Sequence, residues 1–431
     1  MRKVYLSFLG LGTFDPVTKT SRYMPTVYEL NKEKSPKTEF VQVAEIKMMG
    51  TDYFDKVIIA CTQKSFDTHF ENLKNQLENI GVSQISPLII GEDMSSEGQW
   101  NWFEQILLYI DPNDELTIDL THGYRSAPIV ISAAINFLRR SRNIALNAVY
   151  YGAYEKDKGL APIVNMKDFY IINEWAEAVS RLVEDADARK LAELAKKTPE
   201  FQFGELNDNE LISIFDKLTN TIRNVDVNNV SGQANQAISL IKNKLQIASG
   251  TGKILLKLVL DKFSSLATEE PLSGRYDKPY FTVQLEIIRL LLTHKLFMQA
   301  YTVMRELIAS IGMIPFKIEG LKDHERREKR RIFGEMFTSM FHFKEKKWKF
   351  EGEQKKAAFT ELKPYYDKLK DSGIEKILRD FSGDLANYRN GFDHAWTATS
   401  GAESDIEEKG LKFYESLKEV VDLLDKNSFF G

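Results

Sequence analysis

Leu116-Thr117-Ile118-Asp119-Leu120-Thr121-His122-Gly123-Tyr124-Arg125-Ser126 is the stretch that decides the fold of this 431-residue chain. It begins as a short apolar run, typical of a buried strand, and a helical pattern follows from about residue 128. The polar loop between them therefore leaves the carboxyl end of a predicted strand. In an open α/β sheet, ligands bind at these ends.

The same alternation of short apolar runs and amphipathic runs extends over residues 1–170. It predicts strands over 4–9, 56–61, 85–90, 116–120 and 145–151, and helices over 66–80, 99–110 and 127–142. Apolar strands that alternate with helices are typical of a parallel sheet covered on both faces. We therefore expect an α/β Rossmann-like N-terminal domain.

From about residue 168 the pattern becomes helical almost throughout, and it predicts an all-helical C-terminal region. A break rich in Pro, Gly and charge at 269–279 divides it into a connector, 171–280, and a last domain, 281–431. The predicted helices are 172–197, 210–222, 233–248, 253–266, 281–296, 299–312, 364–370, 373–381, the run through 389–394, and 406–426.

The composition of the chain limits the kinds of binding site that it can contain. Hydrophobic residues make up 43% and charged residues 28% of the chain, and its net charge is −4, so any nucleic-acid binding must come from a local patch. The single cysteine, Cys61, indicates a reducing compartment, and the six histidines show no metal-ligand spacing. With no signal peptide or membrane span expected, a cytoplasmic protein without a metal is predicted.

A second strand-end loop, Gly10-Leu11-Gly12-Thr13-Phe14, follows the first predicted strand. Its glycines would let backbone N–H groups approach a phosphate, although a simple tight turn also explains them. Asp15 occupies the third glycine position of a dinucleotide fingerprint, which disfavours a nicotinamide-dependent enzyme. In the loop after residue 120, the Arg125 guanidinium suits contact with a phosphate. The sequence favours neither interpretation of this loop, a ligand site or a purely structural turn.

The hexapeptide Arg389-Asn390-Gly391-Phe392-Asp393-His394 places a guanidinium, a carboxamide and an imidazole on one predicted helix. Arginine can stabilise a pentacoordinate phosphate, and histidine can exchange a proton with a ribose hydroxyl, so these groups suit RNA cleavage without a metal. Positions 389 and 394 lie about 140° apart around a helix. We expect them to converge on one phosphate only when a second copy of the helix packs nearby.

The segment 317–349 holds eleven Lys or Arg against six Asp or Glu, with aromatic residues interleaved. It could track an RNA backbone and stack bases. A helix with a charged outer face and a buried aromatic stripe is the favoured interpretation.

Together, the two strand-end loops and the Arg389-Asn390-x-x-x-His394 motif, in this order, resemble the CRISPR-associated CARF and HEPN ribonucleases of type III immunity. The resemblance implies a homodimer, or a higher oligomer, that binds a cyclic oligoadenylate, expected to be cyclic tetra-adenylate, as its allosteric activator. It implies three catalytic residues, Arg389, Asn390 and His394. It also implies a messenger pocket formed by Gly10, Gly12, Thr13, Phe14, Thr121, His122, Gly123, Tyr124, Arg125 and Ser126.

The implied activity is metal-independent cleavage of single-stranded RNA, in which the substrate's own 2′-hydroxyl is the nucleophile. Two alternatives stay open. The chain could be a nucleotide-sensing binding module without nuclease activity, or its CARF domain could itself cleave the messenger, using Thr13 or Thr121 with Arg125.

Overall fold

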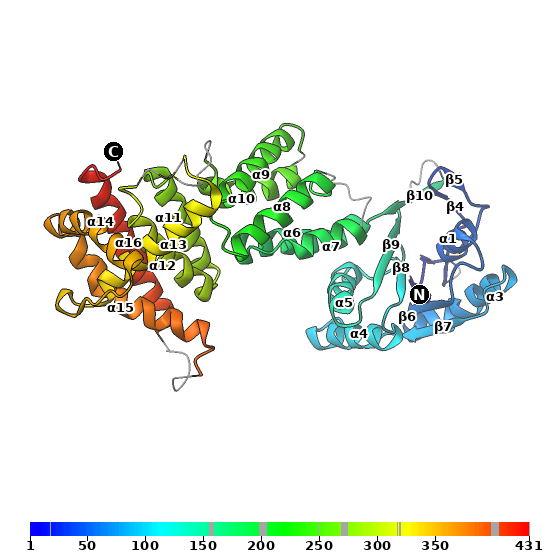
Figure 1. Ribbon diagram of the computed structural model, residues 1–431. Coiled ribbons are helices and arrows are strands. Elements are labelled where there is room, and N and C mark those ends of the chain that lie inside the picture. Colours follow the sequence, from blue (N-terminus) through cyan, green and yellow to red (C-terminus); the bar gives the residue numbers. More distant parts are fainter. Residues whose placement is uncertain are drawn as a thin grey trace. The chain divides into compact units, whose positions relative to one another are not determined.

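The computed structural model describes residues 1–17, 19–154, 159–197, 205–248, 250–268, 275–316, 318, 320–397 and 405–430. Within these residues the chain forms two compact units, Met1–Asn173 and Glu174–Gly431. The first is a mixed α/β domain and the second is all helical, as the sequence predicts (Figure 1). The further division of the second unit at about residue 280 stays a prediction.

The first unit is built on an eight-stranded sheet of order β5-β4-β10-β9-β8-β1-β6-β7. Its parallel part contains all five predicted strands, β1 (Lys3–Leu9), β6 (Lys56–Cys61), β7 (Ile85–Ile89), β8 (Glu115–Asp119) and β9 (Ala145–Gly152). From the central β1, the chain adds β6 and β7 on one side, then β8 and β9 on the other. The two directions meet between β1 and β8.

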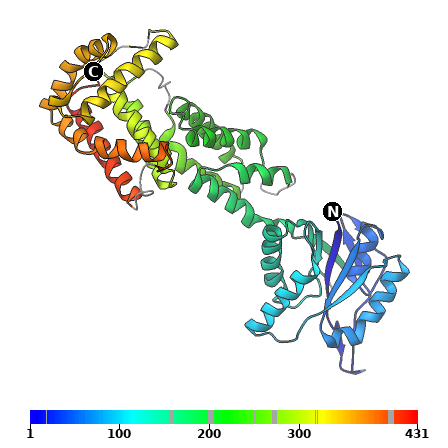
Figure 2. The ribbon, with the colours of Figure 1, turned by 60° about the horizontal axis from the view of Figure 1, so that its bottom comes forward.

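Helices cover both faces of this sheet, and each buries an apolar face against it. The helices α1 (Val41–Met49) and α3 (Glu71–Asn79) share a core with Tyr5 of β1 and Ile59 of β6. The helices α4 (Ser96–Tyr109) and α5 (Ala127–Ser141) lie on the opposite side of the sheet in both views (Figures 1 and 2). The short α2 (Gln63–Ser65) and the π-helical turn η1 (Phe66–Phe70) precede α3 without a break.

One edge of the sheet departs from the prediction. It is mixed rather than parallel, because β10 (Leu160–Asn165) runs antiparallel to β9. Next to it lie β4 (Val27–Leu30) and β5 (Glu33–Lys34), and β2 (Thr13–Asp15) pairs with β3 (Thr20–Arg22) as a separate hairpin. These strands are absent from the predicted set because they are short and have little apolar periodicity. The helix α1 is absent because its first six residues, 41–46, are all buried, so its sequence lacks the one-sided apolar pattern of an amphipathic helix.

The second unit contains eleven α-helices among its described residues. They are α6 (Lys167–Asp185), which begins in the first unit, α7 (Arg189–Lys197), α8 (Asn209–Arg223), α9 (Val230–Leu245), α10 (Gly250–Phe263), α11 (Lys278–Thr293), α12 (Phe297–Ile311), α13 (Asp323–His342), α14 (Glu353–Asp371), α15 (Ile374–Asp393) and α16 (Ile406–Lys426). Two short 3₁₀ turns accompany them, η2 (Ser264–Leu266) and η3 (Glu345–Lys347). Residues 269–274 of the predicted break lie outside the described residues.

The helices α9, α10 and α11 each begin and end three residues before their predicted bounds, and three other predictions in this unit are wrong in kind. The helix predicted over 172–197 is interrupted at Ala186, whose φ is +48°, and the Asp187 carboxylate accepts the Arg189 N–H at 3.0 Å to start α7. Pro364 lies inside α14 rather than at its start, since the preceding turns bury Ala358 and Leu362. The runs 373–381 and 389–394 belong to one continuous helix, α15. None of the described helices is long and apolar enough to cross a membrane.

Candidate functional site

The two strand-end loops of the first unit lie side by side. They leave the carboxyl ends of adjacent strands, since β1 pairs with β8 in parallel with Ser7 opposite Asp119. A Cβ on Gly10 would lie 3.2 Å from the backbone oxygen of His122, so the loops touch. This is the point at which the strand order reverses, where open α/β sheets bind their ligands.

A cavity of about 420 Å³ opens at this point. Five of the predicted messenger-binding residues line it, namely Gly10, Gly12, Thr13, Thr121 and His122. Gly123 and Tyr124 line a neighbouring cavity of about 220 Å³, and Phe14 lines a third, of about 600 Å³. The structure thus gathers most of the predicted residues around one end of the sheet.

Arg125 and Ser126 line none of these three cavities. Arg125 is exposed, whereas Ser126 is the N-cap residue of α5 and makes no capping hydrogen bond with its side chain. The Ser126 hydroxyl is shielded from solvent and has no partner among the described residues. Their role in binding stays a prediction.

The Thr121 hydroxyl is fixed from both sides. It donates to the Asp119 carboxylate, and it accepts the backbone N–H of Gly152 at 2.8 Å. Asp119 is buried beneath the loop, where its other oxygen accepts the Ser7 hydroxyl at 2.6 Å. Burial raises the pKa of this carboxyl. Thr121 therefore joins the loop to the sheet, and its hydroxyl is less available for chemistry on a ligand.

His122 presents a neutral ring to the cavity wall. The ring packs edge-on against Tyr23, with centroids 4.7 Å apart, and its Nε2 is shielded from solvent without a hydrogen-bond partner among the described residues. Burial lowers the pKa of His122 to about 4. At neutral pH this side chain can exchange hydrogen bonds with a ligand, but it adds no positive charge.

Gly12 has a geometric reason to be glycine. Its φ is +70°, and a Cβ there would lie 2.5 Å from the backbone oxygen of Arg22 in β3. The β2–β3 hairpin can therefore fold against the loop only with glycine at this position. It brings to the 420 Å³ cavity two residues that the sequence analysis missed, Tyr23 and Met24. The two strands of this hairpin, Thr13-Phe14-Asp15 and Thr20-Ser21-Arg22, are short and mostly polar, so they have no clear signal in the sequence.

In the second unit, Arg389 and Asn390 lie near the end of α15 on the wall of a cavity of about 220 Å³. One Arg389 nitrogen pairs with Asp393 at 3.1 Å, while its Nε is shielded from solvent and has no partner among the described residues. His394 is the C-cap of the helix, is exposed, and does not line that cavity. The predicted separation of the guanidinium from the imidazole within one chain is therefore observed.

The turn that carries His394 folds back over Gly391. The backbone N–H of Trp396 donates to the Gly391 carbonyl at 2.7 Å, and both Ala395 and Trp396 have positive φ. A Cβ on Gly391 would lie 2.5 Å from Cζ3 of the Trp396 ring. Glycine in the motif thus allows the indole to pack on the helix and sets the position of the histidine.

The aromatic residues of segment 317–349 form a buried stripe on α13, which confirms the favoured interpretation. Phe333, Phe337 and Phe341 are buried, whereas Phe343 is exposed. Lys317 lies outside the described residues. The aromatic side chains of α13 therefore serve the core.

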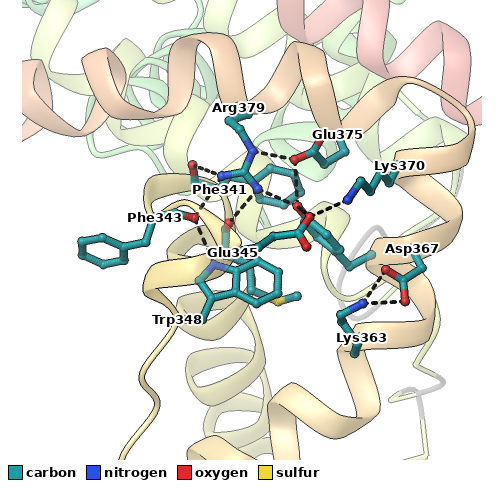
Figure 3. A network of polar contacts seen from close by, with 11 residues as sticks. Phe341, Phe343, Glu345, Trp348, Lys363, Asp367, Lys370, Glu375 and Arg379 are labelled. Carbon is teal, nitrogen blue, oxygen red and sulfur yellow. Dashed lines mark hydrogen bonds and ion pairs between the residues drawn. The ribbon is translucent and has the colours of Figure 1, made fainter.

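A polar network fixes the end of α13 (Figure 3). The Arg379 guanidinium of α15 donates to the carbonyl oxygens of Met340 at 3.2 Å, Phe341 at 3.4 Å and Phe343 at 2.9 Å. It also binds the Glu375 carboxylate at 2.5 Å. Because the last carbonyls of a helix have no partners within the helix, Arg379 acts as a cap supplied by a neighbouring helix.

No protein-family model matches the chain. Over 155 residues it is 25% identical to the CRISPR-associated protein MJ1674 of Methanocaldococcus jannaschii. The chain is thus similar to a CRISPR-associated protein. The match covers 36% of this chain and 22% of that protein, so it spans about a fifth of the relative's length.

Among solved structures, the chain is similar to Enterococcus italicus Csm6 bound to cyclic hexa-2′-fluoro-hexa-dAMP. The TM-score is 0.47 and the identity 10%, with 100% of this chain and 97% of that chain covered.

Proposed function

We propose that this protein is a ribonuclease of type III CRISPR defence that a cyclic oligoadenylate activates. The observation that carries the proposal is the position of Arg389 and Asn390 on a cavity wall, one helical turn before His394 at the end of the same helix. The similarity to a CRISPR-associated protein and the meeting of the two loops at the end of the sheet support it.

The chemistry follows from these side chains. The 2′-oxygen of a ribose attacks its own 3′-phosphorus and the bond from phosphorus to the 5′-oxygen breaks, which leaves a 2′,3′-cyclic phosphate and a 5′-hydroxyl. His394 takes the 2′ proton or supplies one to the leaving oxygen, and Arg389 stabilises the charge on the phosphorane. Asn390 orients one of the two groups.

A homodimer supplies the missing geometry. Within one chain His394 does not line the cavity of Arg389, so a two-fold axis that brings two copies of α15 together would place both residue types at one cleft. The messenger would activate such a dimer if it binds one of two dimer arrangements more tightly. A cytoplasmic location belongs to the same proposal.

The test is cleavage of a fluorescent single-stranded RNA in EDTA, with and without cyclic tetra-adenylate or cyclic hexa-adenylate. We expect one ring to switch on cleavage, products that end in a 2′,3′-cyclic phosphate, and loss of activity in His394→Ala. Loss of activity in EDTA would contradict the metal-independent mechanism. Silence with both rings would favour a binding module.

A second candidate activity is cleavage of the messenger by the first unit. The same protein carrying His394→Ala, incubated with labelled ring, would yield linear products if it occurs. The Thr121 hydroxyl is already held by Asp119 and Gly152, which disfavours it as the attacking group.

A further inference from the structure

The cavity beside Arg389 contains more cationic and hydrogen-bonding groups than the sequence motif accounts for. It lies where α12, α13 and α15 meet, and its volume is about 220 Å³. The α15 residues on its wall recur every three or four positions, as expected of one helix face. The full lining is Arg305, Ile308, Thr338, Ser339, His342, Ser382, Leu385, Ala386, Arg389 and Asn390.

The polar groups on this wall favour an anion. The three hydroxyls, of Thr338, Ser339 and Ser382, each donate to a carbonyl of their own helix. The donors left for a ligand are two guanidiniums, one amide and one imidazole. Among the described residues that line the cavity there is no carboxylate, so the wall suits an anion rather than a metal cation.

The acidic residues nearby only partly offset the two guanidiniums. Glu306 is shared, because it pairs with Arg305 at 2.6 Å and with Arg330 at 3.1 Å. Arg389 pairs with Asp393 through one nitrogen, and its shielded Nε has no partner among the described residues. A buried N–H without an acceptor is unfavourable, so an oxygen ligand in the cavity that accepts from Nε would be stabilised.

His342 is the imidazole that shares this cavity with Arg389. It is the last residue of α13, and its ring packs edge-on against Phe343 with centroids 4.7 Å apart. The carbonyls on either side of it are held by Arg379, which fixes the helix end from which the ring projects (Figure 3). In the described structure of one chain, Arg389 therefore has His342, and not His394, on the wall of its cavity.

We propose that this cavity is a phosphate-binding subsite for the RNA strand and that Arg305 and His342 contact the phosphate next to the one that is cleaved. The proposal rests on the ribonuclease function proposed above. A cavity of about 220 Å³ holds several times the ~30 Å³ of one water molecule, which is enough for a phosphodiester group. Arg305 can give this phosphate the bidentate contact that phosphate oxygens prefer, and Arg389, whose guanidinium has five N–H donors, would lie between it and the cleaved phosphate.

The experiment measures kcat and KM of the messenger-activated full-length protein on single-stranded RNA. We expect Arg305→Ala and His342→Ala each to raise KM about tenfold with kcat within about twofold, as for the loss of one charged hydrogen bond. The slope of log KM against log salt should fall by about 0.7 in Arg305→Ala, which removes one cation from one phosphate. Arg305→Lys should recover part of the affinity.

Matched controls lie on α13. His324→Ala and Arg327→Ala change exposed residues outside the cavity and should leave KM and its salt slope unchanged. If His342→Ala folds poorly by circular dichroism, His342→Gln replaces it. KM values within twofold of wild type for both cavity variants, or a loss of kcat at unchanged KM, would overturn the subsite.

A second measurement separates this inference from the proposed function. Fluorescence anisotropy of labelled RNA with His394→Ala reports binding without cleavage. If the wild type cleaves no RNA with either ring, the proposed function fails, and weaker RNA binding on adding Arg305→Ala would still support the subsite. If the wild type cleaves RNA and Arg305→Ala leaves binding unchanged, the subsite alone is refuted.

Discussion

Replacing Gly391 by alanine should destabilise the helical unit and disable the motif that contains it. The new Cβ would lie 2.5 Å from Cζ3 and 2.6 Å from Cε3 of the Trp396 indole. Because the indole is a rigid ring, the whole side chain would have to move to relieve these contacts. Overpacking of this kind costs about 1–3 kcal/mol, and the better helix propensity of alanine recovers about 1 kcal/mol. Because the contacts are short, the overpacking cost should lie in the upper part of its range, about 2–3 kcal/mol. After the gain in helix propensity, we expect a net loss of about 1–2 kcal/mol in the free energy of unfolding.

The same helix provides the control. Gly383 lies in the interior of α15, and no neighbouring atom lies within 4 Å of a Cβ built there. Gly383→Ala should therefore stabilise the protein by up to about 1 kcal/mol. The two glycine-to-alanine changes thus have opposite expected signs, and only the contact with Trp396 distinguishes them.

The assay is thermal unfolding followed by circular dichroism, together with messenger-activated RNA cleavage. At about 2–4 °C per kcal/mol, Gly391→Ala should melt several degrees below Gly383→Ala. Because the displaced indole belongs to the turn that carries His394, cleavage should fall up to about 100-fold in Gly391→Ala only. A Gly391→Ala protein that melts no lower than wild type, or that cleaves RNA normally, would refute the reasoning.

Three further predictions follow from other parts of the structure. Arg379→Ala should lower the free energy of unfolding in urea by about 3 kcal/mol, since it removes the cation beside the buried Glu375 carboxylate and the donor to three carbonyls at the end of α13. Lys370→Ala, at an exposed pair, should lower it by less than about 1 kcal/mol, and equal losses would contradict the capping role. His122 is protonated below about pH 6.5 in the unfolded chain, but only below about pH 4 in the folded chain, where burial lowers its pKa to about 4. Its contribution to the free energy of unfolding should therefore fall as the pH drops from about 6.5 to about 4 and then level off. A melting-temperature profile against pH that is the same in His122→Asn would argue against this. Gly12→Ala should weaken messenger binding in calorimetry by at least tenfold, because its Cβ meets the backbone oxygen of β3, while Gly159→Ala, with a φ of +60° but no neighbour within 4 Å, should not.

The regular elements were predictable because their burial leaves a periodic pattern. The strand 56–61 and the helix 406–426 were predicted with the bounds that the structure has. The predictions were wrong where a local signal competed with packing. Pro364 is a typical first residue of a helix, yet the turns before it are buried and the helix continues through it.

The candidate sites were predictable only as separate groups. The sequence pointed to both strand-end loops and to the motif at 389–394, since each carries reactive side chains in a characteristic order. The sequence did not place Tyr23 beside the strand-end loops, and it did not place Arg305 and His342 beside Arg389. The spacing of Thr338 and His342, four residues apart on one helix, was a signal that could have suggested a shared face.

By itself the sequence determined the class of fold, the order of its two regions and the side chains that suit phosphate chemistry, because periodicity and residue type act within a few turns of chain. The tertiary structure alone decided which of these side chains share a cavity. Arg305, His342 and Arg389 lie on three different helices, and only the packing of α12, α13 and α15 brings them to one wall. The place of His394 outside that wall, in contrast, was predictable from the sequence, since positions 389 and 394 lie about 140° apart around one helix.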